Sequence, residues 1–243
     1  MSLPRFALPD SVPLAENTVL PLDAGQIKHL LALRLVPGDS LEAHTPSGIW
    51  RAELADVSRH SASVRLVAPI NENREAPIEI HACLPVTAQL GLWDDFLPGV
   101  VELGATLIQP VIYERSQYDK RKVDARLGRW RRIILTACEQ SHRTRIPILH
   151  PPVLLESLQS WSAAQRWVAY ELRTGEPNPN LALESLAFTH GPEGGIADAE
   201  IALLHKSGWK PVSLGKSILR AATCPAAILG AVQMELGRLN RCF

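Results

Sequence analysis

The chain has 243 residues, 46% of them hydrophobic and 21% charged, which is the composition of a globular protein long enough for two domains. Its formal net charge is zero and only 5% of its residues are aromatic, so stacking on many bases is not expected to be its main binding mode. The four cysteines are scattered, and the sequence has neither an apolar signal core nor a run of about 18 apolar residues. We therefore expect a cytoplasmic protein with reduced thiols, no metal and no membrane partner.

The first third of the chain has the pattern of a small β-rich domain. Residues 39–57 alternate around a Thr-Pro-Ser-Gly turn, which predicts a hairpin, and residues 61–69 predict a further strand. Residues 24–39 read as a short helix that Pro37 and Gly38 would stop. We predict a barrel-like domain over residues 1–72, followed by a polar linker that ends at Pro77.

From residue 78 onward, strand-like and helix-like stretches alternate. Apolar runs predict strands, and amphipathic stretches at 126–140, 198–207 and 225–236 predict helices. Alternation of this kind favours a parallel sheet, so residues 78–243 are predicted to form an α/β domain. The strand-like runs are 78–86, 106–113, 166–172, 185–190 and 209–214.

Positive charge is concentrated in residues 115–145, which hold ten Lys or Arg against three acids. Because the whole chain is neutral, the rest of it carries a matching excess of negative charge. Such a block is typical of a surface that binds a polyanion. The alternative is a solvated helix face with charge pairs, but the block itself contains too few acids to neutralise it.

The sequence GPEGG, residues 191–195, lies between a predicted strand and a predicted helix, which is a usual place for a nucleotide-like ligand. It is not a P-loop, and Asp198 and Glu200 in the following turn would repel a phosphate. A ligand that is neutral or cationic there, such as the sulfonium of S-adenosylmethionine, fits better. A second glycine turn at Gly215 follows the next predicted strand end, and the two should lie side by side around one adenosine. The alternative is two ordinary tight turns.

Three motifs, GPEGG, LGKSILR (214–220) and CEQSHRTRIP (138–147), resemble the RsmE family of 16S ribosomal RNA methyltransferases, which belongs to the SPOUT class. The resemblance extends over nearly the full chain. It implies an N-terminal PUA-like β-barrel that contacts RNA and a C-terminal SPOUT α/β domain with a deep trefoil knot. It also implies S-adenosylmethionine as cofactor, a homodimer through the knotted domain, and methylation of N3 of one uracil of 16S rRNA in the small ribosomal subunit.

Site residues carry over from these motifs. Arg220, and after it Arg143, are the candidates for stabilising the uracil anion, because an arginine keeps its charge. The alternative for Arg220 is a buried structural pair, and for Arg5, Arg34 and His142 an ordinary surface role. The predicted cofactor-binding residues are Leu172, Gly191, Pro192, Glu193, Gly194, Gly195, Leu214, Gly215, Ile218 and Leu219. The predicted RNA-binding residues are Arg5, Arg34, Arg115, Gln140, Ser141, His142 and Arg143.

The chain departs from the family pattern at a few positions. Ala222 stands where the family has Glu, and Pro98-Gly99 replaces a common Lys, where the proline is expected to bend or shorten a helix. Ala197 replaces the usual Ser or Thr cap, and Asp198 is expected to take over that cap. Two other functions therefore stay open: a non-catalytic RNA-binding protein on this scaffold, and a SPOUT methyltransferase of another RNA.

Overall fold

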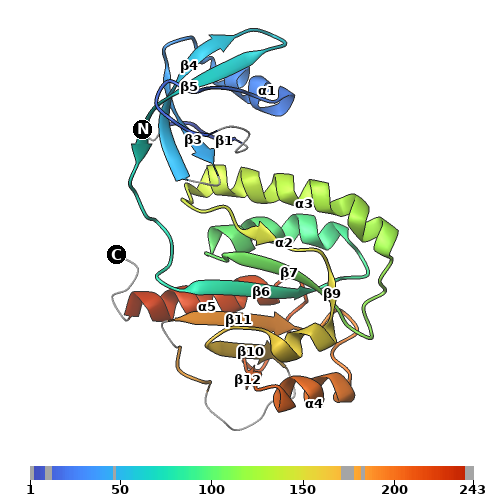
Figure 1. The fold of residues 1–243 in the computed structure, drawn as a ribbon. Helices are drawn as coiled ribbons and strands as arrows, with labels where there is room; N and C mark the ends of the chain where they lie inside the picture. The colour runs from blue at the N-terminus through green and yellow to red at the C-terminus, as the bar shows by residue number, and fades with distance from the viewer. Residues whose placement is uncertain (1–2, 9–12, 46–47, 171–177, 182–183, 239–243) are drawn as a thin grey trace. The chain divides into compact units, whose positions relative to one another are not determined.

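The computed structural model describes residues 3–8, 13–45, 48–170, 178–181 and 184–238. The chain divides into two compact units (Figure 1). The first unit combines Met1–Glu75 with Cys138–Ile146, and the second combines Ala76–Ala137 with Pro147–Phe243. The sequence predicted a first domain over residues 1–72. The structure adds to it residues 138–146, which are distant in sequence.

The first unit is built on a curled five-stranded sheet with the strand order β1-β3-β4-β5-β2. β1 and β3 are parallel, and the other neighbours are antiparallel. The predicted hairpin is confirmed as β3 and β4, and the predicted strand at 61–69 is β5. The elements are β1 (Arg5–Ala7), β2 (Val19–Pro21), α1 (Ala24–Leu33), β3 (Ser40–Thr45), β4 (Gly48–Val57) and β5 (Ala62–Ile70).

Helix α1 has well-defined ends. The Asp23 side chain accepts the Gln26 N–H at 2.9 Å, and the Gln26 side chain accepts the Asp23 N–H at 2.9 Å, which completes a capping box. The helix ends at Leu33 because Arg34 adopts a left-handed conformation with φ 58°. It therefore stops before the Pro37-Gly38 pair that the sequence analysis took as its end.

Segment 138–146 joins the first unit through a buried group of charges. The Glu75 carboxylate forms an ion pair with Arg143 and accepts the backbone N–H groups of Thr144 and Arg145 at 2.7 and 2.9 Å. Arg143 is only 5% exposed. Burial by itself would raise the pKa of Glu75, but the Arg143 guanidinium and the bonds from Thr144 hold it below its ordinary value.

A second buried pair extends this group. Arg5, which is 3% exposed, pairs with Glu42 and donates from Nη1 to the backbone carbonyl of Arg143 at 2.7 Å. On the same segment, Glu139 accepts the Ala7 N–H at 2.7 Å. We call Arg5, Glu42, Glu75 and Arg143 the charge clamp. These bonds tie residues 138–146 to the sheet, and this is why the two pieces of chain form one unit.

The second unit contains a parallel sheet with the strand order β12-β10-β11-β6-β7-β8, and β9 pairs with β7. All its pairings are parallel, as the alternating pattern predicted. Its elements are β6 (Glu79–Pro85), α2 (Gly91–Glu102), β7 (Leu107–Ile112), α3 (Lys120–Ser141, whose last four residues belong to the first unit), β8 (Ile148–Leu149), β9 (Val153–Leu154), the 3-10 helix η1 (Leu155–Ser160), β10 (Gln165–Ala169), β11 (Ser185–His190), α4 (Asp198–Lys206), β12 (Lys210–Val212) and α5 (Cys224–Arg238).

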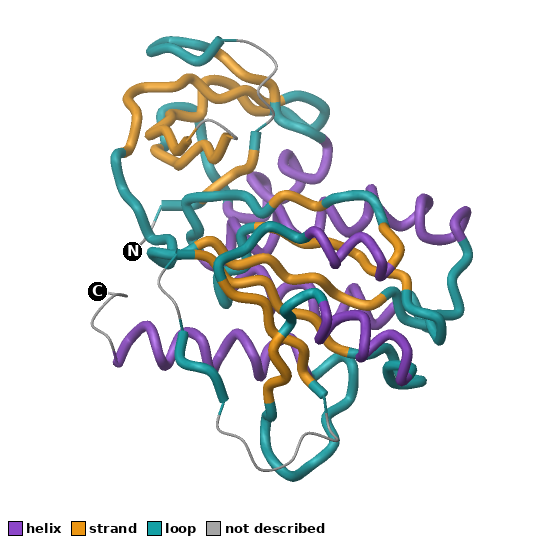
Figure 2. The backbone as a smooth tube through the Cα atoms, turned by 60° about the horizontal axis from the view of Figure 1, so that its bottom comes forward, coloured by secondary structure: helices purple, strands orange, loops and turns teal. Residues whose placement is uncertain are grey.

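Helices lie around the orange strands of this sheet (Figure 2). η1 packs against α4, and Leu158 and Leu204 from these helices share a buried core with Val168 of β10. Elsewhere α2 packs against α5, and Trp93 of α2 stacks on Trp130 of α3 with ring centroids 4.4 Å apart. These contacts hold the strand ends in place, and the site is built on those ends.

One expectation from the sequence needs adjustment. Helix α2 continues through Pro98 to Glu102, so the proline does not end it. Among the described helices, none is long and apolar enough to cross a membrane. The two-part α/β fold that the sequence implied is the observed one, while the trefoil knot stays a prediction.

The charge clamp predicts a large effect of one neutral substitution. Glu75→Gln should lower the free energy of unfolding by about 3 kcal/mol, because it leaves Arg143 buried without its counter-charge. Urea denaturation at neutral pH measures the change. The matched control is Glu72→Gln, whose partner Arg74 is exposed, and it should cost less than about 1 kcal/mol. Equal costs for the two variants would show that the clamp does not hold the unit together.

Candidate functional site

The second unit has a cavity of about 850 Å³ at the carboxyl ends of β10, β11 and β12. Two loops form most of its wall: residues 191–196 after β11, and residues 213–222 after β12. Ligands bind at this edge of open parallel sheets because loops and helix starts meet there. Every described residue that was predicted to bind the cofactor lies on this wall, namely Gly191, Pro192, Glu193, Gly194, Gly195, Leu214, Gly215, Ile218 and Leu219. Leu172 lies outside the described residues.

The strand order changes how the two loops meet. The sequence analysis placed the two glycine turns on adjacent strands, but β10 lies between β11 and β12. The prediction of adjacent strands is therefore wrong. The two loops still face the same cavity because β10 ends between them, and Ala169 and Tyr170 at that end complete the wall.

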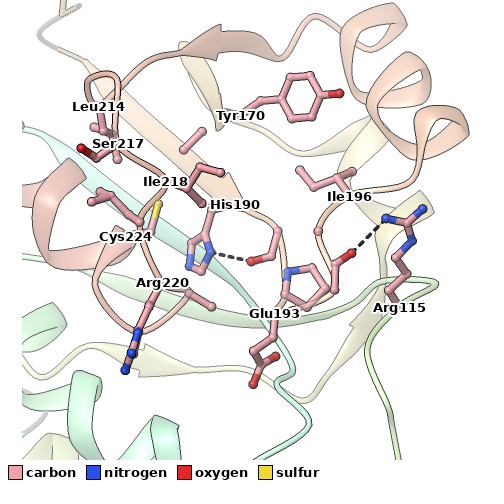
Figure 3. A pocket seen from close by; sticks show the side chains of 18 of the residues that line it. Arg115, Tyr170, His190, Glu193, Ile196, Leu214, Ser217, Ile218, Arg220 and Cys224 are labelled. Atoms are coloured by element: carbon pink, nitrogen blue, oxygen red, sulfur yellow. Dashed lines mark hydrogen bonds between the residues drawn. The ribbon is translucent and has the colours of Figure 1, made fainter. Parts of the chain in front are cut away.

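The first loop approaches its neighbours too closely for a side chain. A Cβ on Gly191 would lie 2.9 Å from Cγ1 of Ile196, and Gly195 has φ +75°, which L-residues rarely adopt. The Gly195 N–H donates to the Pro192 carbonyl at 2.9 Å and closes the turn. Arg115 lines the same wall and donates to the Gly194 carbonyl at 2.9 Å (Figure 3). A Cβ on Gly194 would meet the Arg115 side chain, so this glycine makes room for Arg115.

Helix α4 starts directly after the first loop, and Glu200 caps it. One Glu200 oxygen accepts the Ala197 N–H at 2.9 Å, and the other accepts the Glu114 N–H at 2.7 Å. The expectation that Asp198 would cap the helix is therefore wrong. Asp198 is exposed and lines the cavity, where it contributes negative charge.

The second loop is held at its base and exposed at its tip. The Asn178 side chain exchanges two hydrogen bonds of 2.8 Å with the backbone of Ser213. The Arg220 carbonyl accepts the N–H groups of Thr223 and Cys224 at 2.9 and 3.1 Å, which starts helix α5. Ile218, at the tip, is 81% exposed.

Arg220 projects from this loop with its guanidinium in solvent. It is exposed and lines the cavity, and no acidic partner for it occurs among the described residues. A buried structural pair, the alternative from the sequence, is therefore wrong for Arg220. The side chains of Arg220 and Glu193 extend toward the same side of the cavity (Figure 3). Ala222 also lines the cavity, so the family's carboxylate is missing from this wall.

His190 is a neutral group in the cavity wall that the sequence analysis did not identify. It is 3% exposed, and its Nδ1 lies 2.9 Å from the Gly191 carbonyl. A carbonyl only accepts, so Nδ1 carries the proton and Nε2 is left as an acceptor, for which the described residues provide no partner. Burial lowers the pKa of His190 to about 4. One sequence feature could have identified His190: it ends an apolar run and directly precedes the glycine loop.

Arg143 is not among the residues that line the cavity. Arg143 and Arg5 belong to the first unit and are buried in the charge clamp, so the ordinary surface role that was the alternative for Arg5 is wrong. Arg34 and Gln140 are exposed, and Ser141 and His142 are half-buried. His142 adopts φ 54° at the end of α3, where the Arg143 N–H reaches the Cys138 carbonyl at 3.2 Å. RNA contacts of these residues stay predictions.

Comparisons with known proteins fit this geometry. A family model described as an RNA methyltransferase domain matches residues 74–233. A protein of Synechocystis named ribosomal RNA small subunit methyltransferase E is 31% identical over 92% of this chain and 75% of its own length. The chain belongs to the RsmE family. A protein of the same name from Bacillus subtilis is 29% identical over 91% of this chain and 92% of its own length.

Solved structures agree with the sequence relatives. The ribosomal RNA small subunit methyltransferase E of Neisseria gonorrhoeae, solved bound to S-adenosylmethionine, is 29% identical and superposes with a TM-score of 0.85 over 96% of this chain and 97% of that one. A protein of Porphyromonas gingivalis that is described as a "probable rRNA-methyltransferase", 23% identical, has the same fold with a TM-score of 0.83 over 98% of this chain and 100% of its own.

The buried imidazole predicts how stability depends on pH. The unfolded chain binds a proton at His190 near pH 6.5, whereas the folded chain binds it only near pH 4. Between these values the unfolded state holds more protons, so the free energy of unfolding should fall as pH falls. His190→Leu should reduce this slope by up to about 1.4 kcal/mol per pH unit. Urea titrations from pH 6.5 to 4.5 measure the slope. The control, His60→Leu, alters an exposed histidine and should leave it unchanged.

Proposed function

We propose that this chain transfers the methyl group of S-adenosylmethionine to N3 of one uracil in the 16S rRNA of the small ribosomal subunit. The observation that carries the proposal is the single cavity walled by both glycine loops. Membership of the RsmE family and the cofactor bound in the Neisseria structure support it. A ribosomal substrate implies action in the cytoplasm.

The cavity suits S-adenosylmethionine in size and charge. Its volume of about 850 Å³ lies within the usual range for a pocket that buries a small ligand. The wall carries two acids, Glu193 and Asp198, and two arginines, Arg115 and Arg220, so its charges balance. The acids can lie beside a cationic sulfonium, and the neutral His190 adds no positive charge. The free acceptor at His190 Nε2 is a buried group that a ligand donor can satisfy.

The glycines would hold the cofactor with backbone groups. Where Gly191 and Gly195 leave no side chain, N–H and carbonyl groups can approach an adenosine closely. Apolar side chains on the same wall, Ile196, Leu214 and Ile218, offer a surface for a flat base. When bound, S-adenosylmethionine supplies an electrophilic methyl group.

Arg220 is the residue proposed to act on the uracil. N3 of uracil is a weakly acidic imide and becomes a good nucleophile as its proton leaves, so the site must stabilise the resulting negative charge. An arginine does this without accepting the proton, because its guanidinium stays protonated. Arg220 meets this need because it is exposed at the cavity and lacks an acidic partner among the described residues.

A homodimer through the second unit belongs to the proposal. Met234 on α5 is 79% exposed and Ile218 on the second loop is 81% exposed, which is unusual for side chains of this size. Burial of these apolar groups against a second copy would close the open side of the loop. Sedimentation equilibrium measures the mass, and a monomer at micromolar concentration would exclude this arrangement.

The test is methyl transfer from labelled S-adenosylmethionine to small ribosomal subunits that lack the modification, with the product nucleoside identified by mass. We expect 3-methyluridine in 16S rRNA. Transfer to a different RNA would instead show a related methyltransferase. No transfer and no cofactor binding would leave a non-catalytic RNA-binding protein, and either result would overturn the proposal.

The glycine loop predicts a specific loss of cofactor binding. Gly191→Ala should weaken S-adenosylmethionine binding about tenfold to a hundredfold, because the new Cβ meets Ile196 at 2.9 Å and displaces the loop. Isothermal titration calorimetry measures the affinity. In the control, Gly99→Ala, the added Cβ meets nothing within 4 Å and the helix should be unaffected. Wild-type affinity in Gly191→Ala would remove this loop from the cofactor site.

The role of Arg220 predicts an effect on turnover. Arg220→Ala should lower kcat by about 10² to 10³ while cofactor affinity stays near that of the wild type, because the lost charge acts in the transition state. Steady-state kinetics with saturating small subunits separates the two effects. Arg220→Lys, which keeps a positive charge without the planar fork, should recover part of the rate. An unchanged kcat in Arg220→Ala would exclude the role.

A further inference from the structure

Helix α3 carries most of the positive charge that the sequence concentrates between residues 115 and 145. Residues 120–137, the part of α3 in the second unit, contain seven Lys or Arg and a single acid, Asp124. The sequence alone does not reveal which of these charges are neutralised by acids from elsewhere in the fold. The structure answers this for each side chain.

Four of the seven cations have acidic partners. Lys120 pairs with Asp124, and Lys122 pairs with Asp119. The other two converge on one carboxylate of helix α2, Asp94, with Arg126 at 3.0 Å and Arg129 at 2.7 Å from the same oxygen. Part of the basic block is therefore an ordinary paired surface, as the alternative interpretation expected.

Three arginines remain without acidic partners among the described residues: Arg121, Arg131 and Arg132. All three are exposed. Arg121 and Arg132 are 11 residues apart, which is three helical turns, so they project from the same side of α3. Arg121 and Arg132 lie on the side opposite Val123, Trp130 and Ile134, which are buried, and Arg131 flanks that side about 100° around the helix from Arg132.

The chemistry of this face points to phosphate. The guanidinium group presents a planar fork of donors that matches phosphate oxygens, and it is less strongly hydrated than an ammonium group. None of the large exposed hydrophobic side chains of the described residues lies on α3, so the face lacks the apolar groups that insert into a membrane. The face therefore suits a phosphate backbone in water.

The position of α3 relates this face to the cavity. Arg115 lines the cavity, and α3 begins five residues later at Lys120. Five residues span at most about 18 Å, so the start of the helix lies within a few nucleotides of the cavity wall. Arg121 is in the first turn of the helix.

We propose that the solvent face of α3, formed by Arg121, Arg131 and Arg132, binds the phosphate backbone of RNA beside the nucleotide held at the cavity. The proposal rests on the proposed function for the identity of the polymer, because a ribosomal RNA substrate provides phosphates around its target base. Contacts of this kind position the RNA without reading its sequence.

The test compares two double variants with the same loss of charge. Arg131→Gln/Arg132→Gln removes two unpaired arginines, and Lys206→Gln/Lys210→Gln removes two exposed lysines from α4 and β12. Glutamine keeps a high helix propensity, so α3 should stay folded, and circular dichroism checks this. Binding to purified small ribosomal subunits is measured from about 50 to about 200 mM salt. Phosphate contacts make the affinity fall steeply over this range.

The arginine variant should bind small subunits about tenfold more weakly, and the slope of log affinity against log salt should fall by about two, because each phosphate contact contributes about one. Addition of Arg121→Gln should reduce the slope by about one more. Affinity for S-adenosylhomocysteine and kcat at saturating subunit concentration should not change. The lysine variant should match the wild type in every measurement.

Wild-type affinity and salt dependence in the arginine variant would overturn the proposal, as would an equal loss in the lysine variant. Binding is measured without turnover, so this outcome is distinct from failure of the proposed reaction. If the wild type binds subunits but does not methylate them, the proposed reaction fails, and the salt dependence of the arginine variant still decides the α3 proposal. If it methylates them and the arginine variant binds normally, the α3 proposal alone fails.

Discussion

The common direction of β10, β11 and β12 is the constraint on which the site depends. Because these strands are parallel, their carboxyl ends reach one edge of the sheet, and the loops that follow must face each other there. The end of β10 fills the gap between them with Ala169 and Tyr170. If β10 ran antiparallel to its neighbours, its carboxyl end would lie at the opposite edge of the sheet. Ala169 and Tyr170 would then no longer lie between the two glycine loops. The position of the site therefore depends on the direction of the strands, and the side chains determine what it can bind.

Arginine has two different roles in this chain, and its surroundings decide between them. Arg5 and Arg143 are buried and matched by Glu42 and Glu75, so their charge is used to join two pieces of chain. Arg220 stays in solvent without an acidic partner among the described residues, so its charge is available to a ligand. Removal of one member of a buried ion pair is strongly destabilising because it leaves the other charge buried without a partner. An exposed arginine contributes little to stability and can be reserved for binding.

Local pattern predicted the strands, helices and glycine loops, because alternation, amphipathic spacing and turn residues act within a few positions. Contacts between distant residues could not be predicted in this way. The acids that neutralise α3 include Asp94 on another helix, so a count within residues 115–145 overestimated the free charge. The strand that separates β11 from β12 precedes both in sequence, and periodicity carries no information on strand order. His190 was missed because a single histidine at a strand end has no distinctive spacing.

The charge clamp also has a consequence for the order in which the chain folds. Arg5 and the Arg143 carbonyl that it binds are 138 residues apart, and the part of the second unit before Cys138 is synthesised between them. The first unit cannot acquire its complete buried network until residue 143 has left the ribosome. Contacts of such long sequence separation form late because closing the loop costs entropy before any bond is gained. The N-terminal unit is thus the first to be synthesised, but it completes its fold only after residues 76–137 of the second unit have been made. Its folding is therefore coupled to synthesis of the second unit.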